Sequence, residues 1–181
     1  VELEARLRRG IERGEFLLHY QPLVGVADCS IAGVEALIRW QPPGSDIIPA
    51  GRFISVAEDA GLLVPLGEWV LREACRQMKA WLDAGLRLET MAVNLSPQQF
   101  RRPNIDETIG EILAQTGLPA RYLELEITEG SLMDPGADVE DRLHALKRLG
   151  VRLAIDDFGT GYSSLAYLKR FPVDTLKIDQ S

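Results

Sequence analysis

The sequence predicts an α/β fold built around a mostly parallel sheet. Two observations support this prediction. In the second half of the chain, extended apolar segments alternate with amphipathic helical segments, the pattern of repeated strand and helix units. Gly85, Gly117 and Gly150 each follow a helical segment and precede an extended one, as left-handed helix C-caps do. Earlier in the chain, two extended segments joined by a short turn predict a hairpin, so the first strand is expected to be antiparallel to the second.

Each predicted element rests on a local pattern. Residues 1–14 predict an N-terminal helix, because leucine and isoleucine recur at a helical spacing until Gly14 stops the pattern. The stretch 41–51 is rich in turn-forming residues. The other expected elements are strands at 16–24 and 31–40, helices at 53–60 and 66–84, and then strand and helix in turn at 88–95, 105–116, 122–128, 138–149, 151–155, 162–171 and 175–178.

Length, charge and composition exclude several classes of function. A chain of 181 residues that is 46% hydrophobic fits one domain with a sizeable core. A net charge of −7 without any long basic run argues against binding polymeric nucleic acid. No apolar stretch is long enough to cross a membrane, so we expect no membrane contact by this domain. Two isolated cysteines and two histidines cannot assemble a His/Cys metal cluster, and the isolated cysteines favour a reduced, cytoplasmic location.

The most informative feature is that polar residues end strands that should otherwise be apolar. These residues are Glu35, Asn94, Glu126, Asp156 with Asp157, and Lys177 with Asp179. The carboxyl ends of parallel strands meet at one rim of the sheet, so these side chains are expected to converge there. Glu124 and Glu126 share one face of their strand. Buried carboxylates need a partner, and oxygen ligands without thiolate or imidazole select Mg²⁺, Mn²⁺ or Ca²⁺.

Each of these features has a plainer interpretation when taken alone. Any one of the strand-end residues could be a helix cap or a surface carboxylate. The segment 157–165, which reads DFGTGYSSL, could be a tight turn between a strand and a helix, or a loop whose glycines let it move or approach a ligand closely. Its position directly after a pair of aspartates favours a functional loop.

A series of motifs in a fixed order makes the sequence resemble the EAL-domain phosphodiesterases that hydrolyse cyclic di-GMP. The resemblance extends from about Phe16 to the end of the chain. The motifs are YQP at 20–22, EALIRW at 35–40, NLSPQQF at 94–100, LEITE at 125–129, DDFGTGYSSL at 156–165 and LKID at 176–179.

The resemblance implies a TIM-like (β/α)8 barrel whose first strand is antiparallel, with about six of the eight strands present. Residues 1–181 are then expected to form a single EAL domain that is incomplete at its C-terminal end. The helix at 1–14 is expected to follow an upstream sensory or GGDEF domain. A homodimer, which is typical of the family, is also expected.

The resemblance also implies a role for individual residues. Lys177 corresponds to the lysine that orients the attacking water, and Glu129 to the glutamate that anchors the loop at 157–165. Glu35 is counted with both the catalytic residues and the metal ligands. The implied ligands of the first Mg²⁺ or Mn²⁺ are Glu35, Asn94, Glu126 and Asp156, and the implied ligand of the second is Asp157. The implied substrate contacts are Gln21, Leu37, Arg39 and Pro97.

The implied activity is metal-dependent hydrolysis of cyclic di-GMP to linear pGpG. Two divalent cations can supply a hydroxide and offset the charge on the phosphoryl oxygens, and Ca²⁺ is expected to inhibit. One alternative is a sensor that binds cyclic di-GMP without cutting it. All matched positions are intact here, which favours the enzyme. A second alternative is an inactive truncated fragment, because a later glutamate and glutamine of the family lie beyond Ser181.

Overall fold

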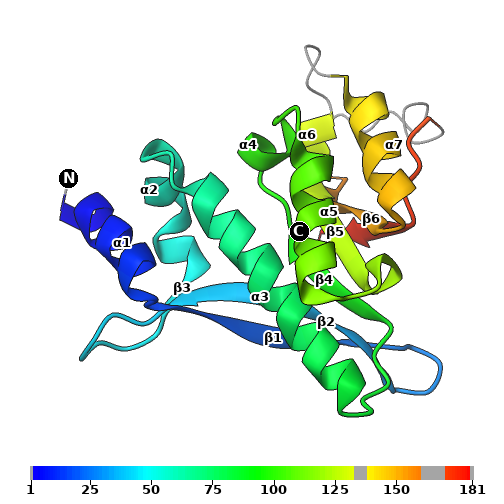
Figure 1. Cartoon of the computed structure of the whole chain (residues 1–181), viewed down its shortest axis with the longest axis horizontal. Helices are drawn as coiled ribbons and strands as arrows, with labels where there is room; N and C mark the ends of the chain where they lie inside the picture. Colours follow the sequence, from blue (N-terminus) through cyan, green and yellow to red (C-terminus); the bar gives the residue numbers. More distant parts are fainter. Residues whose placement is uncertain (1, 133–137, 160–169, 180–181) are drawn as a thin grey trace.

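A computed structural model describes residues 2–132, 138–159 and 170–179, and it contains one mixed sheet. The strands run in the order β1-β2-β4-β5-β6-β7, and in the described part of the chain the sheet stays open between β1 and β7 (Figure 1). Only β1 and the small β3 are antiparallel to their neighbour β2. The strands are β1 Phe16–Val24, β2 Ile31–Trp40, β3 Ile48–Pro49, β4 Thr90–Asn94, β5 Leu123–Thr128, β6 Arg152–Phe158 and β7 Thr175–Ile178.

The predicted α/β architecture is confirmed, and the sheet contains one additional strand. The antiparallel hairpin has the expected bounds, and its register pairs Phe16 with Trp40. The strand β3 lies in the stretch that the sequence predicted as turns. Two residues are too few to leave a periodic pattern, and they are extended because they pair with Arg39 and Trp40 of β2. The helix expected at 162–171 lies almost wholly outside the described residues.

Helices cover one face of the sheet. The long helix α3 packs against α5, and α5 packs against α7, in a row along the sheet (Figure 1). Gly117 and Gly150 end α5 and α7 in the left-handed conformation, as predicted. The helices are α1 Glu2–Arg13, α2 Ile54–Asp59, α3 Leu63–Asp83, α4 Pro97–Phe100, α5 Ile105–Thr116, α6 Glu129–Leu132 and α7 Val139–Leu149, with 3-10 turns η1 Ala50–Arg52 and η2 Ala120–Tyr122.

The two faces of the parallel strands differ in chemistry. Side chains such as Met91, Leu125 and Leu153 point toward the helices and are fully buried in the main core. The alternate residues of the same strands occupy the other face, and among them are Glu35, Glu126 and other polar groups. This alternation places the polar residues predicted at the strand ends on one side of the sheet.

A second, smaller core lies between α1, α2 and the end of β2. Trp40 is its largest buried side chain, and its ring nitrogen donates a hydrogen bond to Glu15. Gly10 lets α1 approach closely, because a Cβ there would lie 2.8 Å from the Trp40 ring nitrogen. The predicted N-terminal helix is thus an integral part of the fold. None of the described helices is long and apolar enough to cross a membrane.

The two cysteines are expected to differ sharply in reactivity. Cys29 is exposed in the turn between β1 and β2. Cys75 is fully buried in α3, and burial raises the pKa of its thiol to about 12, although the charge of Arg72 opposes this rise. Iodoacetamide at pH 8 should therefore alkylate Cys29 alone, as counted by intact mass, and Cys75 only after denaturant is added. Modification of both thiols in the folded protein would contradict this packing of α3.

Candidate functional site

Five side chains from five different strands meet on the polar face of the sheet, and we call them the rim cluster; Glu35 lies in the middle of β2 rather than at its end. Its members are Glu35 of β2, Asn94 of β4, Glu126 of β5, Asp156 of β6 and Lys177 of β7. The ammonium of Lys177 lies among three carboxylates, 2.7 Å from Glu126 Oε1, 3.2 Å from Glu35 Oε2 and 3.6 Å from Asp156 Oδ1. The structure thus brings together residues up to 142 positions apart.

Small residues between the polar ones allow these contacts across the sheet. Ala92 of β4 lies in register between Glu35 and Glu124, and Ala154 of β6 lies in register between Glu126 and Thr175. A methyl group at each position leaves room for longer side chains on the flanking strands to meet above it. Layers formed by alternate strands are the usual way in which a barrel interior is filled.

Glu126 is the most deeply buried member of the rim cluster, with 1% of its side chain exposed. Neither of its oxygens accepts a hydrogen bond of good geometry from the described residues, although Lys177 Nζ is close to Oε1. Burial raises the pKa of Glu126 to about 7; the contact with Lys177 opposes the rise, and the charges of Glu35 and Asp156 add to it. The site therefore favours a cation next to this carboxylate.

Lys177 remains charged in these surroundings. Burial by itself would lower its pKa, but the 2.7 Å contact with Glu126 and the negative charges of Glu126, Glu35 and Asp156 outweigh that effect and raise it. Asn94 adds a further contact, since its Nδ2 donates a hydrogen bond of 2.9 Å to Glu35 Oε1. The two oxygens of Glu35 thus face different partners.

The adjacent aspartates lie at an irregularity in the sheet. The pairing of β6 with β7 shifts between Ile155 and Phe158, and Asp157 has a φ of 55°. In a regular strand the side chains of Asp156 and Asp157 would point to opposite faces, and a bulge of this kind changes that direction. Burial and the charges of Asp156 and Asp179 raise the pKa of Asp157, so its carboxylate lies within electrostatic reach of the cluster.

Glu129 holds the start of the loop that follows β6. It is the first residue of α6, is 5% exposed, and its Oε2 accepts a hydrogen bond of 3.1 Å from the backbone N–H of Gly159. Gly159 has a φ of 101°, a conformation that favours glycine. The remainder of the expected loop, residues 160–165, lies outside the described residues.

The four expected substrate contacts surround the rim cluster at different positions. Gln21 of β1 is the cross-strand neighbour of Glu35. Leu37 and Arg39 follow Glu35 on the same face of β2. The Arg39 guanidinium donates a hydrogen bond to the carbonyl of Ile38, and within the described ranges it forms no ion pair with the carboxylates. Pro97 is the first residue of α4, where Ser96 and Gln99 form a capping box.

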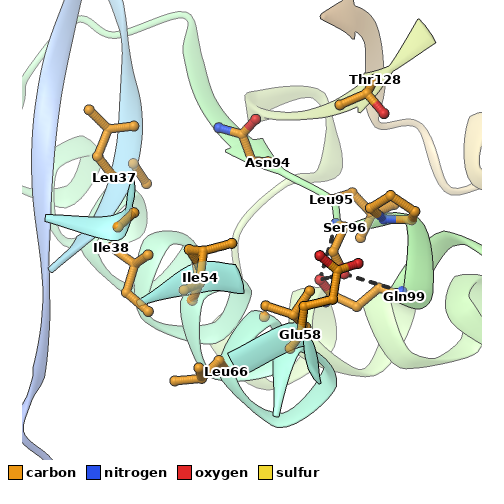
Figure 2. Close-up of a pocket in the computed structure, with 16 residues that line it drawn as sticks. Leu37, Ile38, Ile54, Glu58, Leu66, Asn94, Leu95, Ser96, Gln99 and Thr128 are labelled. Atoms are coloured by element: carbon orange, nitrogen blue, oxygen red, sulfur yellow. Dashed lines mark hydrogen bonds between the residues drawn. The ribbon is translucent and has the colours of Figure 1, made fainter. Parts of the chain in front are cut away.

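A cavity of about 360 Å³ adjoins the rim cluster on the side of α2, α3 and α4 (Figure 2). Asn94, Leu37 and Pro97 belong both to its wall and to the predicted site. Its other lining residues are mostly apolar, with Ile38, Ile54 and Leu66 labelled in Figure 2. The cavity can therefore take the apolar faces of a flat ligand whose charged group reaches the rim cluster.

Two polar residues near the site were missed by the sequence analysis. Gln99 lines the cavity at 2% exposure, and its Nε2 has no hydrogen-bond partner among the described residues. Gly67 allows this placement, because a Cβ there would lie only 2.2 Å from Gln99 Oε1. Arg152 also lies on the polar face, where it pairs with Glu124. Its position two residues after Gly150, at the start of a strand, was the signal that could have found it.

The placement of Glu124 refines the sequence-based expectation. It does share a face with Glu126, but Arg152 Nε lies 3.4 Å from its Oε2 and Thr175 donates a hydrogen bond to the same oxygen. Glu124 therefore has its own partners within the protein, one layer away from the rim cluster.

The rim cluster suits a hard divalent cation by the chemistry of its donors. Across residues 2–132, 138–159 and 170–179, no three acidic, histidine or cysteine side chains are already arranged around one metal position, and the ammonium of Lys177 lies among the carboxylates instead. The two buried oxygens of Glu126 lack hydrogen bonds among the described residues and are therefore suited to coordinate a cation. Glu35, Asn94 and Asp156 are the neighbouring oxygen donors.

A TIM-like sheet with carboxylates, an amide and a lysine on its polar face defines a barrel-type domain whose candidate site lies at the carboxyl rim of the strands. The family model of the EAL domain matches residues 4–181, and the chain belongs to the EAL-domain family. The sequence resemblance is thereby confirmed over nearly the whole chain.

Relatives with described functions cover the same region. The chain is 46% identical over 180 residues to the bifunctional diguanylate cyclase/cyclic di-GMP phosphodiesterase MucR of Pseudomonas aeruginosa, covering 99% of this chain and 26% of that protein. It is 42% identical over 181 residues to the cyclic di-GMP phosphodiesterase NbdA of the same organism, covering 100% of this chain and 23% of that protein. The chain thus spans about a quarter of these relatives.

A solved structure has the same fold. The PaMucR phosphodiesterase, determined in complex with cyclic di-GMP, superposes with a TM-score of 0.93 and 45% sequence identity. The match covers 99% of this chain and 72% of that one. The TIM-like architecture predicted from the sequence is therefore confirmed, and the main path of the sheet contains the six strands that were expected.

Proposed function

We propose that this chain is the hydrolytic domain of a metal-dependent cyclic di-GMP phosphodiesterase whose product is linear pGpG. The observation that supports the proposal most directly is the rim cluster, where a lysine ammonium lies between 2.7 and 3.6 Å from three carboxylates. Family membership and the cyclic di-GMP complex of a 45% identical relative support the same substrate.

The proposed reaction cuts one phosphodiester bond of the ring. A water oxygen forms a bond to phosphorus, and the bond from that phosphorus to the ribose 3′ oxygen breaks, so that this oxygen leaves with a proton. Glu35, Asn94, Glu126 and Asp156 would hold one Mg²⁺ or Mn²⁺, with Asp157 as a ligand of a second. Bound cations would supply a hydroxide and offset the charge on the phosphoryl oxygens.

The other residues position the reacting groups. Lys177 has only N–H donors, so it can hold a water by its oxygen and offset negative charge beside the phosphate. Arg39 offers a planar fork of donors to a phosphate or to a guanine edge. Glu129, through Gly159, fixes the first residue of the loop after the two aspartates. Gln21, Leu37 and Pro97 border the space next to these groups.

The cavity beside the rim cluster is proposed to hold one guanine base of the substrate. Its walls are largely apolar, which suits the faces of a purine, and the amide of Gln99 offers a donor to an acceptor on the base. A dinucleotide bound in this way places a phosphate near Asn94, which belongs to both the cavity and the rim cluster.

The alternative is a sensor that binds cyclic di-GMP without cutting it. One observation favours this second function, namely that in the described part of the chain the cluster is closed around Lys177 rather than open around a metal position. The two functions make the same prediction for binding and opposite predictions for product.

A chromatographic assay separates them. The purified protein is incubated with cyclic di-GMP and Mn²⁺, and pGpG is measured over time. We expect pGpG to accumulate, to disappear when EDTA is added, and to fall when Ca²⁺ replaces Mn²⁺. Binding measured by calorimetry together with no pGpG under any of these conditions would select the sensor, and absence of both would refute both functions.

Filling the cavity should weaken substrate binding. Ile54 lines the cavity, so Ile54→Trp is expected to raise the dissociation constant for cyclic di-GMP at least about tenfold, equivalent to 1.4 kcal/mol or more. The measurement is calorimetry in Ca²⁺, where turnover is not expected. Ser55→Trp is the matched control, because Ser55 is exposed on the same helix and does not line the cavity. Equal affinities for both variants would exclude the cavity as the base site.

The partners of the whole protein follow from the same family. We propose that it acts as a homodimer in the cytoplasm, with a sensory or GGDEF domain preceding residues 1–181. The relative MucR, of which this chain spans 26%, is a bifunctional diguanylate cyclase/cyclic di-GMP phosphodiesterase, and its two activities support a second domain in the whole protein.

A further inference from the structure

A second polar layer lies directly next to the rim cluster, toward the amino ends of the strands, and we call it the lower layer. Glu124, which is only 5% exposed, is at its centre. Thr175 Oγ1 donates a 2.8 Å hydrogen bond to Glu124 Oε2, and Arg152 Nε lies 3.4 Å from the same oxygen. Arg152 Nη1 also donates to Thr90 Oγ1 at 3.4 Å.

The lower layer and the rim cluster connect the same two strands. Glu124 and Glu126 occupy one face of β5, and Thr175 and Lys177 occupy the corresponding face of β7. β5 and β7 do not pair with each other, because β6 lies between them. The two contacts from β5 to β7 are therefore successive side-chain bridges across β6, and Ala154 leaves the space for them.

Backbone pairing alone holds β7 weakly at the position of Lys177. In the described residues β7 pairs only with β6, through Thr175, Leu176 and Ile178. The register shifts between Leu176 and Ile178, so Lys177 lies where the ladder is interrupted. A slip of one residue would turn its side chain to the opposite face of the sheet. The bridge between Thr175 and Glu124 acts at the first pair of this ladder, one residue before the last regular pair, which is Ile155 with Leu176.

Burying Glu124 requires a compensating role. Glu124 loses its water on burial, whereas Arg152 remains 41% exposed, so the net stabilisation from this pair is expected to be small. Here the pair specifies geometry: Arg152 fixes the carboxylate, and the carboxylate accepts the Thr175 hydroxyl from a single direction.

We infer that Glu124 and Thr175 are positioning residues. They set the position of β7 along its own axis relative to β5, and with it the position of the Lys177 ammonium against Glu126 and Glu35. The inference rests on the proposed function for its consequence in catalysis, since Lys177 is the group that would orient the attacking water. Neither residue is among the expected substrate contacts; each acts through Lys177.

The test compares Thr175→Val, which keeps the shape of the side chain but removes its donor, with Thr175→Ser, which keeps the donor. Thr175→Val is expected to lower kcat for cyclic di-GMP about 10- to 100-fold with KM little changed, because small displacements of a catalytic group have effects of this size. Thr175→Ser should retain most of the wild-type kcat. Thr108→Val on α5 is the matched control, since it removes a threonine hydroxyl whose hydrogen bond lies far from the rim in sequence and structure.

A second measurement does not depend on activity. Mass spectrometry measures how fast a small amine-reactive reagent, acetic anhydride, acetylates Lys177. This rate is compared with that of Lys79 in the same sample, well below the melting temperature. We expect this ratio to rise in Thr175→Val and to return to the wild-type value in Thr175→Ser. A lower melting temperature with unchanged kcat and unchanged Lys177 labelling would overturn the inference and leave Glu124 and Thr175 a purely structural role. If the wild-type protein forms no pGpG, the proposed function fails, and the labelling ratio still decides the inference.

Discussion

Replacing Lys177 with methionine is expected to lower the rate of pGpG formation about 10²- to 10⁴-fold, the range found when a group that assists proton transfer or holds the nucleophile is removed. Methionine keeps the length of the side chain and removes the ammonium that lies among Glu35, Glu126 and Asp156. Three carboxylates then face one another without a cation, so the metal-free protein should also melt at a lower temperature.

The same variant gives a second readout in its response to metal. A divalent cation can replace the missing ammonium among the carboxylates, so Mn²⁺ should raise the melting temperature of Lys177→Met more than that of the wild type. Lys79→Met is the matched control, because Lys79 pairs with Asp83 on the outer surface of α3. Wild-type turnover in Lys177→Met would remove this lysine from the mechanism.

Replacing Glu126 with glutamine is expected to reduce metal-dependent turnover at least about 100-fold, because an amide is a much poorer ligand for a hard cation than a carboxylate. The glutamine has the same shape and no charge, so it avoids the cost of an ionised carboxylate whose two oxygens are buried without hydrogen bonds. The folded protein without metal should therefore be at least as stable as the wild type.

Two measurements check this prediction together. Turnover is followed by pGpG formation, and stability by thermal melting with and without Mn²⁺. The stabilisation by Mn²⁺ should be lost in Glu126→Gln but kept in Glu111→Gln, a control in which an exposed glutamate of α5 is changed. If Mn²⁺ stabilises Glu126→Gln as it does the wild type, Glu126 is not a metal ligand.

The elements with strong local signals were predicted well. The bounds of α5 follow from its apolar repeat and from Gly117, which ends the helix at Thr116. The hairpin strands follow from their composition and the turn between them. β3 could not be predicted, because two residues have no period and they are extended only through their pairing with β2.

The candidate site was predictable in its membership and not in its geometry. Glu35, Glu126 and Lys177 interrupt apolar strands and were therefore expected at one rim, although Glu35 lies in the middle of β2. Which oxygen meets the ammonium, and that the ammonium itself lies among the carboxylates, depends on strand register and on the small side chains of Ala92 and Ala154 between them. These contacts depend on the combined register of several strands, and no local sequence pattern predicts that register.

The sequence by itself determined the family, the order of the six main strands and the longer helices, and the residues that line the rim, because motifs, periodicity and helix caps are local properties of a chain. The tertiary structure decided three things. It paired Glu124 with Thr175, placed Asp157 at the irregular end of β6, and formed the cavity around Gln99. Each depends on how close residues far apart in sequence come when strands and helices pack, and packing at van der Waals distance is a property of the whole fold.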